Sequence, residues 1–266
     1  TKFTTLACAA WDRPRWVQAT AAGAILLGTY LLYVLWPGTG IPLATGNPDV
    51  GVTAAWAQEH LQGIAPAWHK NANAGHFIDL WLLNRLPRHE PFVFNDGGYQ
   101  TINFIPSLAT MLFGLMCGEL LRSSMHDHRK LAVLALAGGA GILLGWLLDV
   151  TGICPVVKRI WTPSWTLYST GICCWILASL FGLVDVLGYR RWTWPLMIVG
   201  VNSIAIYCMS QLLKPWTART LTTHFGSHVF SWAGPLWEPM VQACLVGLCF
   251  WLACFWMYRQ KIFVRI

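Results

Sequence analysis

Long apolar stretches separated by shorter polar segments dominate the chain. A helix needs about 20 apolar residues to cross the hydrocarbon core of a bilayer, and six stretches reach or approach that length: residues 16–36, 101–121, 131–148, 165–187, 194–213 and 236–258. We therefore predict an all-α fold, a polytopic membrane bundle of about six helices. The third stretch is the shortest and is rich in glycine, which favours close packing against a neighbouring helix.

One long polar segment, residues 37–100, separates the first two spans. Its run WHKNANAGHFIDLWLLNRLPRHEPF contains His76 and Asp79 together with two tryptophans. Polar side chains can bind the hydroxyl and amino groups of a sugar, and an indole ring can stack on its apolar face. Two interpretations stay open at this point. The run forms an amphipathic helix around residues 75–86 that packs over the bundle, or it forms a binding site in which His76 and Asp79 contact a sugar.

The composition supports a membrane protein and excludes several other classes. Hydrophobic residues make up 56% of the chain and charged residues only 11%, whereas a soluble domain carries about 25% charged residues. No hydrophilic linker divides the chain, so we expect residues 1–266 to form a single transmembrane domain. The net charge of +7 does not indicate a nucleic-acid partner, because Lys and Arg lie between apolar runs. The nine cysteines contain no C-x-x-C spacing, and we predict no metal site.

The positions of Lys and Arg near the helix ends predict the orientation of the spans. Most of them would lie on one side of the bilayer: Lys2, Arg13, Arg15, Arg122, Arg129, Lys130, Arg190, Arg191, Arg259, Lys261 and Arg265. The short loops of the other side hold fewer, namely Lys158, Arg159, Lys214 and Arg219. Basic residues concentrate on the cytoplasmic side of membrane proteins. Both termini are therefore predicted to be cytoplasmic, and segment 37–100 is predicted to lie outside.

Two features inside this pattern have more than one interpretation. Lys158 lies on the outer side, against the charge rule, in a short segment flanked by tryptophans. It either extends to the lipid headgroups or faces an outer cavity. Asn202 lies well inside the fifth stretch, where its amide needs a partner. It forms either a hydrogen bond between helices or part of a pocket.

Three segments of the chain carry recognisable motifs. In CPVVKRIWTPSWTLYSTG the pattern Pro-x-x-Lys-x-Leu/Ile-Trp-x-x-Ser is met by Pro155, Lys158, Ile160, Trp161 and Ser164. In VDVLGYRRWTWPLMIVGVNSIAIY the pattern Gly-x-Asn-Ser-Ile is met by Gly200, Asn202, Ser203 and Ile204. The third segment is NDGGYQTINFIPSLATMLFGLMCGELLRS, an outer entrance followed by a helix that ends at a basic loop. Together, from about residue 70 to the C-terminus, they resemble the heparan-α-glucosaminide N-acetyltransferase family and its bacterial relatives, which are multi-spanning membrane acyltransferases.

The resemblance implies a bacterial cytoplasmic (inner) membrane protein that transfers acetyl groups across the bilayer. The donor would be cytoplasmic acetyl-CoA, a co-substrate, and the acceptor an amino sugar on the outer side. Lys158, Trp161, Ser164 and Asn202 would shape the acceptor site together with His76 and Asp79. Basic side chains form charge-assisted hydrogen bonds with phosphates, so the CoA phosphates would contact the inner residues Arg122, Arg129, Lys130, Arg190 and Arg191. The other interpretation of these basic residues is that they only anchor helices.

The chain departs from the family pattern at the catalytic residue. The family's proposed catalytic histidine lies in a His-x-x-Trp-Asn-Gly-like loop on helices that precede the segments found here, and the chain contains no such motif. We therefore expect the chain to be the C-terminal portion of such an enzyme and to need an N-terminal half for catalysis, and the catalytic residue stays unknown. The alternative is a non-catalytic structural subunit that packs against other membrane protein subunits or against a second copy of itself.

Overall fold

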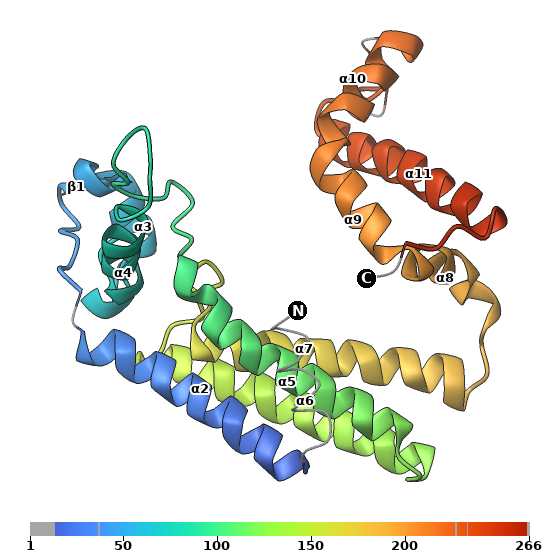
Figure 1. Ribbon diagram of the computed structural model, residues 1–266, viewed down its shortest axis with the longest axis horizontal. Coiled ribbons are helices and arrows are strands. Elements are labelled where there is room, and N and C mark those ends of the chain that lie inside the picture. Colours follow the sequence, from blue (N-terminus) through green and yellow to red (C-terminus); the bar gives the residue numbers. More distant parts are fainter. Residues whose placement is uncertain (1–13, 37, 227, 233, 265–266) are drawn as a thin grey trace. The chain divides into compact units, whose positions relative to one another are not determined.

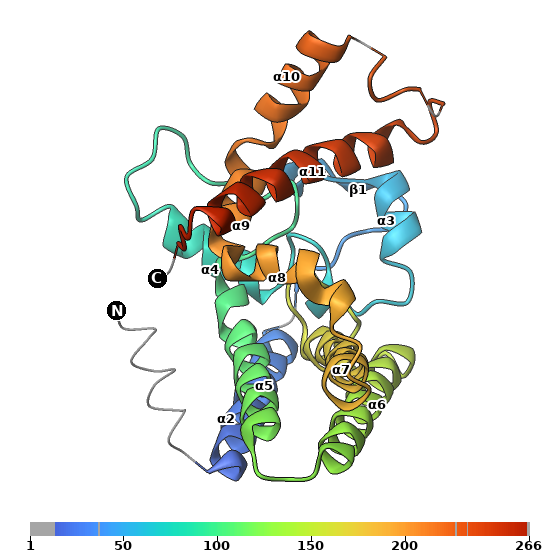
Figure 2. The same ribbon diagram turned by 90° about the vertical axis from the view of Figure 1, so that its right-hand side faces the viewer.

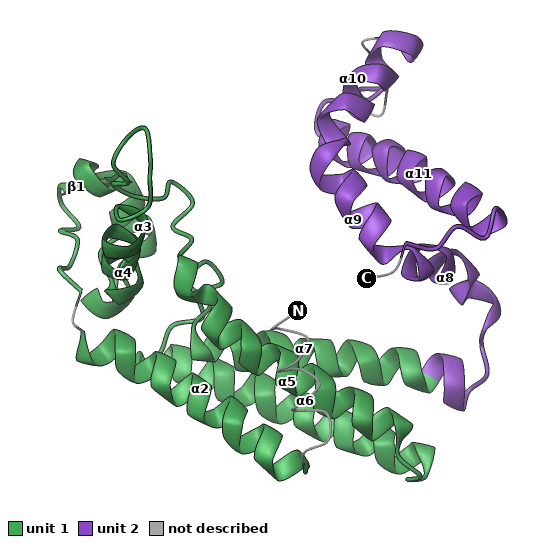
Figure 3. Ribbon diagram, in the orientation of Figure 1, with its two compact units in different colours: residues 1–182 green, residues 183–266 purple. Residues whose placement is uncertain are grey.

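The computed structural model describes residues 14–36, 38–226, 228–232 and 234–264. The chain divides into two compact units, residues 1–182 and residues 183–266 (Figure 3). In the described residues helices predominate, and the sheet structure consists of a single two-stranded antiparallel ribbon.

Four long apolar helices form the membrane-spanning part of the first unit: α2 (Arg15–Leu35), α5 (Phe104–Arg122), α6 (Asp127–Val150) and α7 (Pro163–Phe181). A 3-10 turn, η3 (Thr101–Asn103), leads directly into α5, and a π turn (Gly182–Val186) extends α7. At 1.5 Å per residue these helices are roughly 28–36 Å long, which matches the thickness of a bilayer core. α2 packs along α5 and α6 packs along α7 (Figures 1 and 2).

Large apolar side chains cover the outward faces of these helices. Leu35 is 76% exposed, Leu136 is 74% exposed and Trp146 is 50% exposed. Water would disfavour so much exposed apolar surface, whereas lipid chains solvate it. With the long apolar helices, this surface makes the chain an integral membrane protein. The predicted all-α, polytopic membrane bundle is confirmed.

α6 and α7 approach each other closely along a face of glycines on α6. A Cβ atom at Gly141 would lie 2.8 Å from the backbone oxygen of Leu167, and one at Gly145 would lie 2.7 Å from that of Ser164. A side chain at either position would therefore force the two backbones apart. The glycine-rich third span packs tightly against a neighbour, as its composition predicts.

The polar segment between α2 and α5 folds at one end of this bundle (Figure 1). Its strands and helices are β1 (Gly46–Asn47), η1 (Pro48–Val50), β2 (Val52–Thr53), α3 (Ala54–His60), η2 (Pro66–Trp68) and α4 (Ala74–Leu83). In the ribbon Gly46 pairs with Thr53, and Asn47 pairs with Val52. Asn73 caps α4, because its side-chain oxygen accepts the backbone N–H of His76 at 3.2 Å. α4 is the helix expected around residues 75–86, and it ends earlier, at Leu83.

The second unit contains η5 (Arg191–Thr193), α8 (Trp194–Val201), α9 (Ser203–Leu212), α10 (Lys214–Phe225) and α11 (Glu238–Arg259). α11 is long and apolar enough to cross a membrane. The predicted fifth span is instead a bent pair, α8 and α9, with an angle of 68° at Asn202. The described helices therefore provide five straight candidate spans, or six if the bent pair crosses as one.

Asn202 explains why the chain bends there. Its backbone leaves the helical region, with φ −122° and ψ 39°. Its side-chain amide donates to the backbone oxygen of Ile262 at 3.2 Å and accepts the backbone N–H of Val264 at 3.1 Å. Both ends of the buried amide thus bind the segment that follows α11, and this contact satisfies a buried polar group between two apolar helices.

Candidate functional site

A chain of buried polar side chains joins α2 to the polar segment. The Tyr33 hydroxyl donates to Oε1 of Gln100, the Gln100 amide donates to Oδ1 of Asn73, and the Asn73 amide donates to the backbone oxygen of His69 at 2.8 Å. All four residues are buried. Buried polar networks whose hydrogen bonds are satisfied make a structure rigid. This one fixes the polar segment on the end of α2.

His69 supports the segment through both ring nitrogens. Nδ1 accepts the backbone N–H of Ile41 at 2.9 Å, and Nε2 lies 2.9 Å from the backbone oxygen of Ile64. Because Nδ1 accepts a hydrogen bond, the ring hydrogen is on Nε2, which donates it to Ile64. Neither nitrogen is left for a metal or a substrate, so His69 is a structural residue.

A polar cleft of about 270 Å³ lies next to this network. The residues that line it are Asp79, Leu83, Phe92, Asn95, Tyr99, Gln100 and Thr101. Asp79 is only 3% exposed, and its two carboxylate oxygens lie 3.0 and 3.2 Å from the backbone nitrogen of Thr101, which donates to them. A carboxylate has about four lone-pair sites. One N–H group therefore leaves Asp79 able to accept hydrogen bonds from a ligand.

His76 lies one helical turn before Asp79, on the same face of α4. Its ring is buried, and its centroid is 6.5 Å from that of Phe92 in the cleft wall. Burial lowers the pKa of His76 below its ordinary value of 6.5, and the Asp79 carboxylate offsets part of this effect. His76 is therefore mainly neutral at pH 7. The structure thus brings together the two residues that the sequence proposed for this segment.

Basic residues lie beside the loop that forms one wall of the cleft. The Arg159 guanidinium donates to the backbone oxygen of Gly97 at 2.8 Å, and the Asn103 amide donates to the backbone oxygen of Arg159 at 2.7 Å. The pKa of Lys70 is lowered by burial and, to a lesser degree, by the Arg159 cation, with Asp96 acting in the opposite direction. A cation, Arg159, and an anion, Asp96, thus act on Lys70 in opposite directions beside this wall.

The motif residues around the start of α7 hold the turn that carries Arg159. Ser164 is completely buried and donates to the backbone oxygen of Pro155 at 2.6 Å. The Trp161 indole donates to the hydroxyl of Thr110 at 3.3 Å, whereas Lys158 is exposed. None of the three is among the residues that line the cleft. Their role in substrate binding stays a prediction, as does that of Asn202.

The basic residues predicted to bind CoA occupy helix ends in both units. In the first unit Arg122 ends α5, and Arg129 and Lys130 lie in the first turn of α6. Lys130 is buried and pairs with Asp127 at 3.2 Å. In the second unit Arg190 pairs with Asp185 at 3.7 Å, and Arg191 is exposed. Their contact with a nucleotide stays a prediction.

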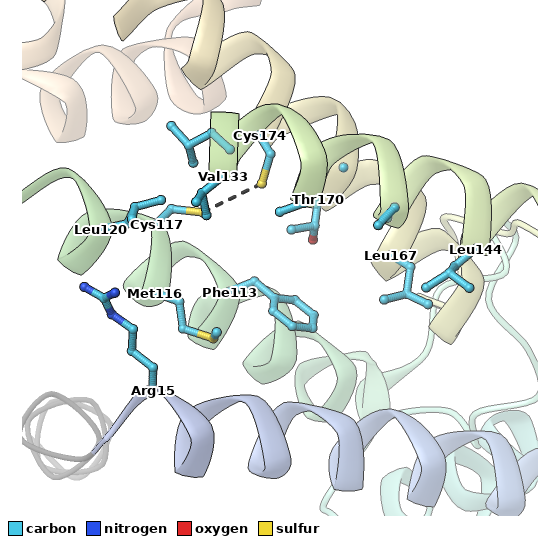
Figure 4. Close-up of a pocket in the computed structure, with 15 residues that line it drawn as sticks. Arg15, Phe113, Met116, Cys117, Leu120, Val133, Leu144, Leu167, Thr170 and Cys174 are labelled. Atoms are coloured by element: carbon cyan, nitrogen blue, oxygen red, sulfur yellow. Dashed lines mark hydrogen bonds between the residues drawn. The ribbon is translucent and has the colours of Figure 1, made fainter. Parts of the chain in front are cut away.

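A second cavity, of about 350 Å³, lies among α5, α6 and α7 (Figure 4). Its walls are mainly apolar, with Phe113, Leu144 and Leu167 among them, and Arg15 lies at one end. The sulfur atoms of Cys117 and Cys174 are 3.7 Å apart in its wall. Few polar groups line this cavity, so it suits an apolar chain rather than a sugar.

Comparison of the chain with models of known protein families gave no match, and comparison with characterised proteins gave none either. The resemblance of the three segments to an acetyltransferase family therefore stays a prediction.

Sequence reasoning missed most of the cleft. Of the residues that line the cleft, the sequence proposed only Asp79; Asn95, Tyr99 and Gln100 were not proposed as site residues. A usable signal was present: the run NDGGYQTIN places several polar side chains directly before an apolar span, where a loop at the membrane surface carries them.

Proposed function

We propose that this chain provides the acceptor side of a membrane acyltransferase and binds an amino sugar in the cleft at Asp79. The donor in this proposal is acetyl-CoA from the cytoplasm, and the chain lies in a bacterial cytoplasmic membrane with both termini inside. Transfer forms an amide bond to the sugar nitrogen and breaks the thioester bond of acetyl-CoA. The bound ammonium group loses one proton to a base and a second to the departing CoA thiolate, which leaves as the thiol. The proposal assigns this base to none of the described cleft residues.

The buried carboxylate of Asp79 is the observation that carries the proposal. A buried carboxylate is unfavourable unless it is paired or hydrogen-bonded, and a protonated amine supplies both a charge and hydrogen bonds. Asn95 and Thr101 offer further polar groups for sugar hydroxyls, and Phe92 and Tyr99 offer aromatic faces. A cleft of about 270 Å³ has room for a monosaccharide.

The neutral His76 fits the same assignment. Because its pKa lies below the ordinary value, His76 adds no positive charge beside Asp79 at pH 7 and does not repel an ammonium group. The positions of three basic residues support the acetyl-CoA side of the proposal. Arg122, Arg129 and Lys130 lie at the opposite ends of α5 and α6 from the cleft loop, as transfer across a bilayer requires.

A binding measurement tests the proposal. The purified full chain in detergent is titrated with glucosamine, and saturation-transfer NMR reports the bound sugar. We expect glucosamine to bind and glucose, which lacks the amine, to bind at least tenfold more weakly. The variant Asp79→Asn keeps an acceptor for the Thr101 N–H but loses the charge, so glucosamine binding should fall to the level of glucose.

Asp49→Asn is the matched control, because Asp49 is exposed in the same polar segment and is not among the cleft residues. It should bind glucosamine as the wild type does. Equal binding of glucosamine and glucose, or unchanged binding in Asp79→Asn, contradicts the proposal.

One set of contacts favours a second candidate, a non-catalytic subunit of a larger membrane complex. The side chains of Ser164 and Asn202, two of the motif residues, form hydrogen bonds with backbone atoms of this chain. The same is true of His69. In this second candidate the motif residues only stabilise the fold of the chain. The glucosamine titration will then show no specific binding.

A further inference from the structure

The apolar cavity of the first unit has the shape of a groove that runs along the helices. On α6 its lining residues extend from Val133 to Leu144, a distance of about 16 Å at 1.5 Å per residue. Half the thickness of a bilayer core is about 15 Å. The groove is therefore as long as one leaflet is deep.

The two ends of the groove differ in chemistry. Leu144 and Leu167 lie at one end, and Arg15 lies at the other beside Leu120 (Figure 4). Arg15 is the first residue of α2, so it lies where a span meets the membrane surface. The groove thus combines an apolar channel with a cation at the depth of the lipid headgroups.

Arg15 has more hydrogen-bond donors than its contacts with Glu119 use. Its Nε is 3.6 Å from a carboxylate oxygen of Glu119, and its Nη2 donates to the backbone oxygen of Glu119 at 3.2 Å. Glu119 is in turn held by the amide of Gln18 at 2.6 Å. A guanidinium has five N–H donors, and the Arg15 side chain is 44% exposed. Glu119 therefore orients the guanidinium while leaving N–H groups for a phosphate, the anion that Arg binds best.

We propose that this groove binds one glycerophospholipid, with an acyl chain between α5, α6 and α7 and the phosphate on Arg15. The groove is as long as one leaflet is deep, and Arg15 carries a positive charge at its mouth. Both features favour a phospholipid of the adjoining leaflet. Such a lipid fills space that the side chains of the bundle leave open, and it holds the α2–α5 pair against the α6–α7 pair.

Photocrosslinking tests this site. The full chain is reconstituted with a phospholipid that carries a diazirine midway along one acyl chain, and cross-linked residues are mapped by mass spectrometry. We expect cross-links to concentrate on groove residues such as Phe113 and Leu167. Ala140 lines the groove and is exposed, so Ala140→Phe should fill it and reduce these cross-links at least fivefold.

Matched variants separate the groove from ordinary lipid contact. Ala132 is exposed on the same helix but does not line the groove, so Ala132→Phe should leave the cross-links unchanged. Arg15→Gln should reduce them and Arg15→Lys should restore them, which tests the site even if Ala140→Phe fails to fold. Cross-links spread evenly over the lipid-facing surface, cross-links to a second copy of the chain in the groove, or no response to Arg15→Gln overturns the proposal.

Discussion

The buried His76 makes the stability of the protein depend on pH. Its pKa in the folded state lies below the ordinary value of 6.5 because of burial, so the unfolded chain binds a proton more readily. The stabilisation is present above pH 6.5 and is lost as the pH falls through the lower, folded-state pKa. We predict that the midpoint of thermal unfolding falls between pH 7 and pH 5, and that His76→Gln reduces this fall.

The change of the unfolding midpoint with pH is the quantity to compare. The midpoint at a single pH is less informative, because His76→Gln also changes packing at every pH. His89 lies in the same segment and is exposed, so His89→Gln should keep the wild-type slope. A full wild-type slope in His76→Gln would show that groups other than His76 control the pH response.

At the scale of single residues, the sequence predicts side-chain pairs within one helix better than hydrogen-bond networks between distant segments. His76 and Asp79 are three residues apart, and helical spacing alone places them on one face. Gln100 bonds to Tyr33 across 67 residues and to Asn73 across 27. No local pattern encodes such contacts, because they depend on how α2 and the polar segment pack.

Among the helices, the closest contact lies between α6 and α7 and depends on glycine. A Cβ atom at Gly145 would lie 2.7 Å from the backbone oxygen of Ser164, so Gly145→Ala must push two backbones apart. Overpacking of this kind costs about 1–3 kcal/mol. We predict a loss of that size in the free energy of unfolding, measured by denaturation in mixed micelles.

Gly139 is the matched control, because a Cβ atom there would make an ordinary contact of 3.8 Å with the Trp175 ring. Gly139→Ala should be neutral or should stabilise the helix by about 0.5–1 kcal/mol, since alanine is the better helix former. Equal losses in Gly139→Ala and Gly145→Ala would mean that the α6–α7 contact is looser than described.

The sequence predicts straight helices more reliably than broken ones. Length and apolar composition were enough for α2, α5, α6, α7 and α11, whose bounds lie within a few residues of the predicted spans. The bend between α8 and α9 was not predicted. The bend depends on hydrogen bonds between Asn202 and backbone groups about 60 residues further along the chain. The apolar composition of residues 194–213 does not predict such a distant contact.

At the scale of the whole molecule, transfer across a membrane requires the cleft and the basic loop between α5 and α6 to lie on opposite sides. α5 begins at the cleft loop, where Thr101 binds Asp79, and ends at Arg122. One crossing of the bilayer separates these two points. The positive-inside rule predicts that the Arg122 end lies in the cytoplasm and the cleft outside.

Cysteine accessibility in intact cells measures this sidedness directly. Glu90 is exposed near the cleft and Ser124 is exposed in the basic loop, so each is replaced by cysteine in a chain whose native cysteines have been changed to serine or alanine. With a thiol reagent that does not cross membranes, we predict labelling of Glu90→Cys in intact cells and labelling of Ser124→Cys only after the cells are opened. Labelling of Ser124→Cys alone in intact cells, or of both positions from the same side, would contradict an outer acceptor cleft.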